Sequence, residues 1–284
     1  MPIDPGRALG HELGEGTYGY DKDRVILYHL GVGAGNPPTD PNELEYTYEK
    51  NLKVLPSFGV IPVFGAMGGL ASVPGLSFNF AMLLHGEQDI QIHQPIPPEA
   101  KISNKGRVAE IWDKGKAALV VLQVDTRDES GQPLFTNRFS LFLRGEGGFG
   151  GEKGPKAGNE APSREPDGRI ETRTLPQQAL IYRLSGDKNP LHADPDFARM
   201  GGFDKPIIHG LCSYGIVCKA IVDRVLGGDV TKVARYQARF AGVGFPGETY
   251  VTSWWREGNR ILIEAKSKER DAPIISNCAI HVRS

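Results

Sequence analysis

The stretch LCSYGIVCKAIVDRVL, residues 211–226, decides the fold of this chain. It is apolar on almost every side until Lys219. A helix of this composition is buried, because an amphipathic surface helix would carry a continuous polar face. The stretch therefore predicts a central helix, and a sheet wrapped around that helix would bury it.

Long strands on both sides of this helix supply the sheet. Residues 101–143 predict three strands, joined by a hairpin at Asp113–Lys116 and by the turn DESGQP. Residues 232–282 predict KVARYQARF as a strand, a hairpin turning at Glu257–Asn259, and APIISNCAIHV as the last strand. Strands joined by hairpins form antiparallel sheets, so each half of the chain predicts an α+β arrangement of layers.

Short motifs shared by the two halves indicate an internal duplication. Trp112–Gly115 matches Trp255–Gly258, and YHLGVG (residues 28–33) lines up with YRLSGD (residues 182–187). In this alignment Gly33 stands opposite Asp187, and no histidine follows Gly33 at the matching spacing. The second half thus keeps ionisable groups that the first half lacks.

Three segments rich in glycine predict turns and connections. Residues 24–35 end in the glycines of GVGAG, which favour a tight turn with positive φ over a phosphate loop, because the GxxxxGK[ST] pattern is absent. Residues 55–80 are rich in Gly, Pro and aromatic side chains and predict little regular structure. Residues 146–174 predict a linker between an N-terminal half (1–145) and a C-terminal half (175–284).

Composition limits the classes of function. The 284 residues include 33 basic and 34 acidic ones, so no excess of positive charge favours nucleic acid or an anionic membrane. Three cysteines without a CxxC pattern argue against a disulfide framework or a zinc ribbon. The first residues lack a secretory signal, and prolines and glycines in residues 59–78 argue against a membrane helix. We expect a cytoplasmic protein without membrane insertion.

The candidate chemistry lies in YRLSGDKNPLHADPDFARMGGFDKPIIHGLCSYG, residues 182–215. Asp187 and His192 flank a turn at Asn189–Pro190, and such a pair suits general acid–base work on one water. Asn189 can hold its own turn or fix that water. The alternative is an Asx-turn before a capped helix, with no chemistry, because caps and turns use the same residue types.

Gly210 strengthens the catalytic hypothesis, since unpaired N–H groups at the start of the buried helix favour negative charge, as in an oxyanion hole. We interpret His209 as structural, with its side chain satisfied locally. A calcium loop is excluded by the residue types at its glycine and closing positions. A transition-metal site made of Asp187, His192 and Asp194 has too few ligands, so we expect no metal.

Residues 182–212 resemble the hydratase 2 motif of the MaoC-like, R-specific enoyl-CoA hydratases, a family that includes the hydratase domain of peroxisomal multifunctional enzymes type 2. LYHLGVG, LLHGEQ, WDKG, FSLFLRGEGGFGG, RYQARF and WREGNRI also resemble their counterparts in that family. The resemblance implies a double hot-dog fold, with two antiparallel sheets that each wrap around a helix. It further implies a reduced N-terminal helix that leaves room for the acyl chain, a homodimer, and no cofactor besides the CoA of the substrate.

By the same resemblance, Asp187 and His192 are the catalytic pair, Asn189 supports them, and the Gly210 N–H binds the thioester oxygen. Positions that contact CoA or the acyl group in the family correspond here to His85, Gly86, Lys114, Lys188, Pro190, Leu191 and Phe240. The implied reaction is reversible syn-hydration of trans-2-enoyl-CoA to (3R)-3-hydroxyacyl-CoA in fatty-acid or steroid side-chain β-oxidation. We favour His192 as the principal proton carrier, although the residues alone leave its division of labour with Asp187 open.

Three other functions stay open at this point: a (3R)-hydroxyacyl-carrier-protein dehydratase, a hot-dog acyl-CoA thioesterase, and a non-enzymatic acyl-CoA-binding protein. The acyl chain is equally open, from short to steroid. The chain ends in HVRS rather than the peroxisomal signal SKL, and no dehydrogenase is fused to it, so we expect a stand-alone bacterial enzyme.

Overall fold

One antiparallel sheet of ten strands forms the frame of the computed structural model, in the order β1-β3-β4-β5-β2-β7-β10-β9-β8-β6. The structure describes residues 3–156 and 158–283, without the side chain of Ala81. The strands are β1 (Glu12–Tyr20), β2 (Leu83–Ile92), β3 (Ala100–Asp113), β4 (Ala117–Arg127), β5 (Pro133–Arg144), β6 (Gly168–Arg173), β7 (Val233–Phe240), β8 (Thr249–Glu257), β9 (Arg260–Ser267) and β10 (Ala272–Val282).

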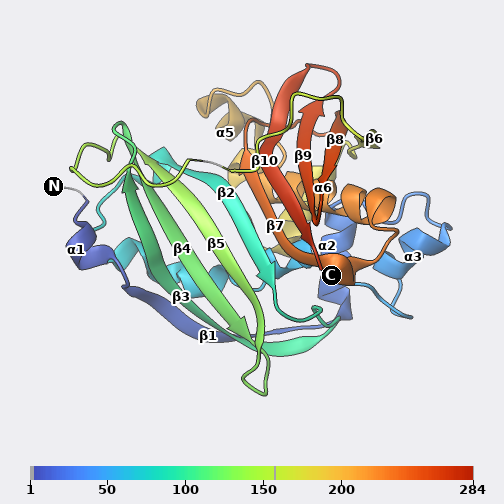
Figure 1. The fold of residues 1–284 in the computed structure, drawn as a ribbon, viewed down its shortest axis with the longest axis horizontal. Helices are drawn as coiled ribbons and strands as arrows, with labels where there is room; N and C mark the ends of the chain where they lie inside the picture. Colours follow the sequence, from blue (N-terminus) through green and yellow to red (C-terminus); the bar gives the residue numbers. More distant parts are fainter. Residues whose placement is uncertain (1–2, 157, 284) are drawn as a thin grey trace.

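The two halves of the chain meet where β2 pairs with β7 (Figure 1). Across this seam Arg239 bonds Glu87 at 2.6 Å and Arg235 bonds Asp89 at 2.5 Å. The two sheets predicted from the sequence are therefore continuous. The predicted α+β double hot-dog fold is confirmed, as are the hairpins of both halves.

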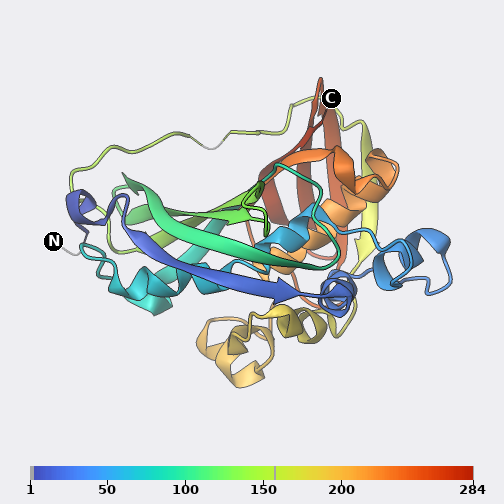
Figure 2. The same cartoon turned by 90° about the horizontal axis from the view of Figure 1, so that it is seen from below.

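The predicted central helix is α6 (Gly210–Val225), and each of its residues from Leu211 to Val222 is buried. The helices lie on one side of the sheet, where Figure 2 shows α6 beneath the C-terminal strands. Within the part of the chain that the structure describes, no helix is both long and apolar enough to cross a membrane.

In the N-terminal half, short 3-10 helices take the place of a central helix: η1 (Pro56–Val60) and η2 (Phe64–Ser72). The backbone of η2 lies directly against β1 and β3. A Cβ on Gly69 would lie 2.0 Å from the Leu13 carbonyl oxygen, and one on Gly106 would lie 2.2 Å from that of Ala66. The segment expected to have little regular structure is thus helical in short turns, and glycines permit its close packing.

The remaining helices are short: α1 (Pro5–Ala8), α2 (Lys22–Gly31), α3 (Pro41–Thr47), η3 (Phe80–Met82), α4 (Gln178–Tyr182), η4 (Arg183–Ser185), η5 (Pro190–His192), α5 (Pro195–Met200) and η6 (Val230–Lys232). Asp40 caps α3 and Asp194 caps α5, and a proline follows each cap. The rings of Tyr28 on α2 and Tyr182 on α4 lie 6.0 Å apart, so the paired motifs of the two halves pack together. Gly33 and Gly35 have the predicted positive φ.

A long connection crosses the sheet on the side away from the helices (Figure 2). It is anchored by the Asp113 carboxylate, which accepts hydrogen bonds from the N–H groups of Gly115, Gly148 and Gly150 at 2.8–2.9 Å. The predicted linker, residues 146–174, is too long, because residues 168–173 at its end form the edge strand β6. In GRIETR exposed charged residues alternate with half-buried Gly, Ile and Thr, so the segment lacks the continuous apolar face that indicates a strand in the sequence.

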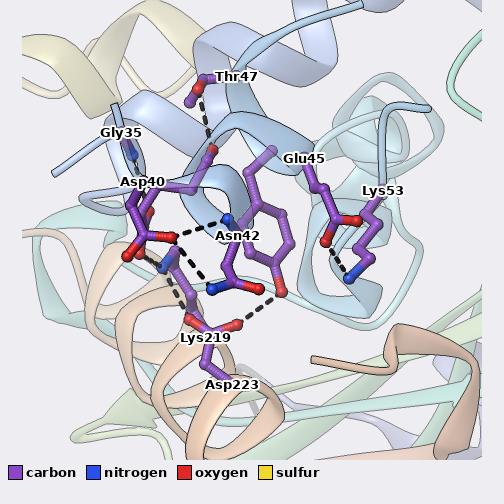
Figure 3. Close-up of polar contacts among 10 residues, drawn as sticks. Gly35, Asp40, Asn42, Glu45, Thr47, Lys53, Lys219 and Asp223 are labelled. Carbon is purple, nitrogen blue, oxygen red and sulfur yellow. Dashed lines mark hydrogen bonds and ion pairs between the residues drawn. The ribbon is translucent and has the colours of Figure 1, made fainter. Parts of the chain in front are cut away.

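A buried ionic cluster joins α3 to the middle of α6 (Figure 3). The Nζ of Lys219 donates to Glu43 at 2.6 Å and to Asp223 at 2.8 Å. The Tyr46 hydroxyl donates to Asp223 at 2.7 Å, and Lys219 Nζ lies 5.0 Å from the Tyr46 ring centroid. Lys219, the first charged residue in the apolar stretch, is therefore paired, as a buried charge has to be.

Candidate active site

Two nested turns place Asp187 and His192. The Asp187 carboxylate accepts the Asn189 N–H at 3.1 Å, and the Asn189 side-chain oxygen accepts the Leu191 N–H at 3.0 Å. Pro190 then starts η5, which ends at His192. The Asx-turn expected as the non-catalytic alternative is thus present, and it is also the device that orients the candidate pair.

His192 is a neutral base with a defined tautomer. Its Nδ1–H donates to the carbonyl of Ile207 at 2.9 Å, which leaves the lone pair on Nε2. Burial lowers the pKa of His192 below its usual value, against the opposing effects of the Ile207 carbonyl and the Asp187 charge. Only 8% of the residue is exposed, so its free nitrogen is available in a largely desolvated site.

An oxygen of Asp187 and a ring nitrogen each of His192 and His209 lie within 4.8 Å of one another. One water can bridge a carboxylate oxygen and a nitrogen at such a separation, since each hydrogen bond is about 2.8 Å long. The geometry therefore suits the shared water expected from the sequence.

His209 departs from its predicted role. Its ring stacks on His192, with centroids 3.6 Å apart and planes at 26°. Its Nε2–H donates to the backbone carbonyl of Asp187 at 3.2 Å, whereas its buried Nδ1 has no hydrogen-bond partner among the described residues. The side chain is thus only half satisfied, and its contacts are with the candidate catalytic residues. Its position just before Gly210 was the sequence signal for this involvement.

The same three side chains are the group that could hold a metal ion. The in-plane lone pairs of stacked imidazole rings lie in two separate, nearly parallel planes, whereas a tetrahedral metal site needs ligands that converge on one point. Asp194, the third ligand weighed from the sequence, instead caps α5 by accepting the N–H groups of Asp196 and Phe197. The arrangement fits acid–base chemistry better than metal binding.

Gly210 is the first residue of α6 and is exposed. N–H groups in the first turn of a helix lack intrahelical partners and carry partial positive charge. A Cβ on Gly210 would lie 3.2–3.4 Å from ring atoms of Phe240 on β7. Glycine therefore keeps open a narrow space between the helix start and an aromatic ring, which is suitable for a planar thioester.

His85 on β2 forms the adjoining wall. Its ring lies 5.0 Å from that of Phe240 and 5.4 Å from that of Phe139, and its Nε2–H donates to the Glu87 carbonyl. Burial lowers the pKa of His85 to about 4, and the charge of Asp187 opposes that shift. A side chain on Gly86 would strike the Phe142 ring at 2.4 Å, so the strand needs glycine there.

Of the other predicted contact residues, Lys188 and Pro190 are exposed in the Asp187–His192 loop, and Leu191 is half-buried there. Lys114 lies elsewhere. Its Nζ donates to the carbonyls of Lys153 and Pro155 in the connection, and it lines a cavity of about 630 Å³ between that connection and the sheet. The structure thus brings His85, Phe240 and Gly210 together near Asp187, and it places Lys114 on the opposite face of the sheet.

Comparisons with known proteins assign both halves of the chain to one family. The model of the MFE-2 hydratase 2 N-terminal domain matches residues 18–145, and that of the MaoC-like domain matches residues 157–277. The chain belongs to the MaoC-like hydratase 2 family. It is 43% identical over 277 residues to enoyl-CoA hydratase ChsH3 of Mycobacterium tuberculosis, covering 97% of each chain.

Two further relatives extend the comparison. Peroxisomal enoyl-CoA hydratase 2 of Arabidopsis thaliana is 41% identical over 284 residues, covering 94% of this chain and 92% of that one. The crystal structure of a MaoC-like dehydratase from Phytophthora capsici superposes with a TM-score of 0.88 at 33% identity, covering 99% of each chain. Both halves of the fold are therefore shared with these proteins.

Proposed function

We propose that this protein catalyses the reversible syn-hydration of trans-2-enoyl-CoA to (3R)-3-hydroxyacyl-CoA in the β-oxidation of fatty acids or steroid side chains. The observation that carries the proposal is the bare Nε2 of neutral His192 beside the Asp187 carboxylate, close to Gly210, the exposed first residue of α6. The names of the relatives support the substrate class, since two of them are enoyl-CoA hydratases.

In the hydration direction, His192 Nε2 accepts a proton from a water that Asp187 also holds. The water oxygen forms a bond to C3 and the C2–C3 double bond opens. The electrons of that double bond move to the thioester oxygen through the C1–C2 bond. The Gly210 N–H stabilises the resulting enolate. A proton then passes from His192 to C2 on the same face, the carbonyl re-forms, and the site regains its starting protonation.

The roles of the other side chains follow from their positions. Asn189 fixes the loop, while His85 and Phe240 flank the thioester. Lys188, Pro190 and Leu191 contact the CoA or acyl part, as does Gly86 by family position. Lys114 has no part in this site, because it lies on the opposite face of the sheet. The reaction needs no cofactor and no metal, because proton transfer and an oxyanion site supply its chemistry.

The test is an absorbance assay for loss of the enoyl-thioester, with short-chain, long-chain and steroid CoA substrates and chiral analysis of the product. The (3R) product from at least one substrate supports the proposal. Release of free CoA thiol would indicate a thioesterase, turnover only of a carrier-protein thioester would indicate a biosynthetic dehydratase, and binding without turnover would indicate a non-enzymatic protein.

The assembly and location of the protein are further parts of the proposal. We propose a homodimer on the basis of the family resemblance, and a bacterial, cytoplasmic enzyme because a bacterial hydratase is among its relatives at 43% identity. Light scattering of the purified protein, which separates a mass of about 62 kDa from the 30.9 kDa of one chain, tests the assembly.

A further inference from the structure

His209 contacts both residues of the candidate catalytic pair and precedes Gly210, although the reaction above assigns it no role. Its ring stacks on His192 at 3.6 Å, and its Nε2–H holds the backbone carbonyl of Asp187 at 3.2 Å. Its own backbone carbonyl accepts hydrogen bonds from the first turn of α6, the turn that begins at Gly210. One residue therefore links the base, the acid loop and the oxyanion donor.

The surroundings of His209 restrict its movement. The residue is 1% exposed, and its ring lies 5.0 Å from that of Tyr182 as well as against His192. Tyr182 in turn packs on Tyr28 of the other half of the chain. A buried ring with aromatic neighbours of this kind can serve as a fixed support.

His209 itself is unsuited to carry a proton in the reaction. Burial and then the neighbouring His192 lower its pKa to about 3, with Arg183 acting in the same sense and Asp187 in the opposite one. It therefore stays neutral at neutral pH, and its single ring proton is committed to the Asp187 carbonyl. Its contacts point to a role exerted through other residues.

We propose that His209 is a positioning residue. Its ring fixes the plane of His192 and its Nε2–H fixes the Asp187 loop, so that both catalytic groups keep a constant position relative to the Gly210 N–H. This inference rests on the function proposed above. Misplacing reacting groups by about 1 Å can lower a rate by about 10². Loss of either contact should therefore lower kcat, while KM changes little because His209 does not face the CoA.

Two replacements separate the two contacts. His209→Phe keeps an aromatic ring and removes the hydrogen bond, whereas His209→Gln keeps a donor and removes the ring. We expect each to lower kcat at least about tenfold with KM within about twofold. In His209→Gln, water should also reach His192, and the pKa of His192 should then rise toward its usual value. The acid limb of the profile of kcat against pH should therefore move to higher pH.

The pKa of His192 can also be followed without substrate, by NMR of isotope-labelled histidine, with its signal assigned through His192→Gln. The other ionisable groups around it are Asp187 on its loop, Arg183 on η4, Tyr182 on α4 and His85 on β2. None of these is altered in the two variants. His93→Gln, at a position on the far side of the sheet, serves as the control for replacing a histidine and should keep wild-type kcat.

Wild-type kcat and an unmoved acid limb in both folded variants would overturn the positioning role. A loss of activity that merely follows the loss of folded protein would do the same. So would stoichiometric zinc in the purified enzyme with activity lost on chelation, since the three side chains would then be metal ligands. If the wild type hydrates no enoyl-CoA, the proposed function fails, and the NMR comparison still decides whether His209 controls His192.

Discussion

The space between Gly210 and the Phe240 ring exists because glycine has no Cβ atom. A Cβ there would lie 3.2–3.4 Å from three atoms of the Phe240 ring, close enough that the ring or the helix start must shift. The N–H groups of the first turn of α6 would remain, but their distance to a thioester oxygen would change. Oxyanion donors depend on that distance, because their contribution is greatest at 2.7–3.1 Å.

We predict that Gly210→Ala lowers kcat about tenfold or more, because the added methyl group displaces the thioester oxygen. Phe240→Leu in the same chain should restore part of the activity, since it frees the space that the methyl group needs. Steady-state kinetics of the single and double variants measure this, with Phe240→Leu alone as the control. An additive double variant would contradict the steric explanation.

At the scale of elements, the Gly-rich tract after β5 serves as an anchor. The Asp113 carboxylate on the β3–β4 hairpin gathers three backbone N–H groups, two of them from this tract. These hydrogen bonds lower the pKa of Asp113. The N–H groups of the tract are thus satisfied by a carboxylate that the protein itself supplies.

Asp113→Asn should release this anchor, because an amide cannot accept hydrogen bonds at both ends of its side chain. We predict faster proteolytic cleavage within residues 146–156 and a lower Tm. The matched control is Asp128→Asn, where a carboxylate accepts backbone N–H groups in the exposed β4–β5 turn. Equal cleavage rates in both variants and the wild type would count against the anchor.

The Lys219 cluster holds α3 against α6 (Figure 3). Its side chains are 10% exposed for Lys219, 16% for Glu43 and 26% for Asp223. Removing the one cation would leave two carboxylates facing each other with little water. Breaking a buried ion pair in this way costs about 3–5 kcal/mol.

We therefore predict that Lys219→Met lowers the free energy of unfolding by about 3–5 kcal/mol, measured by urea denaturation. Adding Glu43→Gln and Asp223→Asn should recover most of the loss, since no unpaired charge then remains. If the triple variant is as unstable as the single one, the loss arises from packing around the lysine stem instead.

Sequence patterns predicted the elements that local physics determines. The apolar run of α6 and the hairpins of both halves were confirmed. The strand β6 was missed, because an exposed edge strand needs no apolar face. The η1 and η2 turns were not foreseen either, since their form is dictated by the strands they pack against.

The sequence predicted the catalytic loop of the candidate site but not the contacts that this loop makes with distant residues. Asp187, Asn189 and His192 lie within six residues, so their turn chemistry is visible in the sequence. His209 joins them through its ring contact with His192, 17 residues away, and its hydrogen bond to the Asp187 carbonyl, neither of which a local pattern encodes. His85 reaches Phe240 only because β2 pairs with β7, a contact between halves that no local pattern encodes.

At the scale of the whole molecule, buried neutral histidines should make the fold sensitive to acid. His29 is fully buried, with Nδ1–H donating to the Tyr46 carbonyl and Nε2 accepting the Leu55 N–H. Burial lowers the pKa of His29 to about 4. An unfolded histidine has a pKa of about 6.5, so between these values the unfolded chain binds more protons than the folded one.

Stability should therefore be unaffected by His29 above about pH 6.5 and should fall as pH drops, by about 3 kcal/mol near pH 4 from this residue alone. We predict that His29→Gln, although less stable at pH 7, shows a smaller loss of unfolding free energy between pH 7 and pH 5. Urea denaturation at both pH values measures the difference. A loss as large as that of the wild type would show that His29 is not the source.

The hydration kinetics of Asp187→Asn and His192→Gln are the most direct test that Asp187 and His192 are the catalytic pair. Both variants keep side chains of similar size and lose the proposed acid–base function. We predict that the wild type forms (3R)-3-hydroxyacyl-CoA and that each folded variant has a kcat lower by about 10² or more, with a small change in KM. Near wild-type turnover in either folded variant would contradict the assignment of this pair as the catalytic groups.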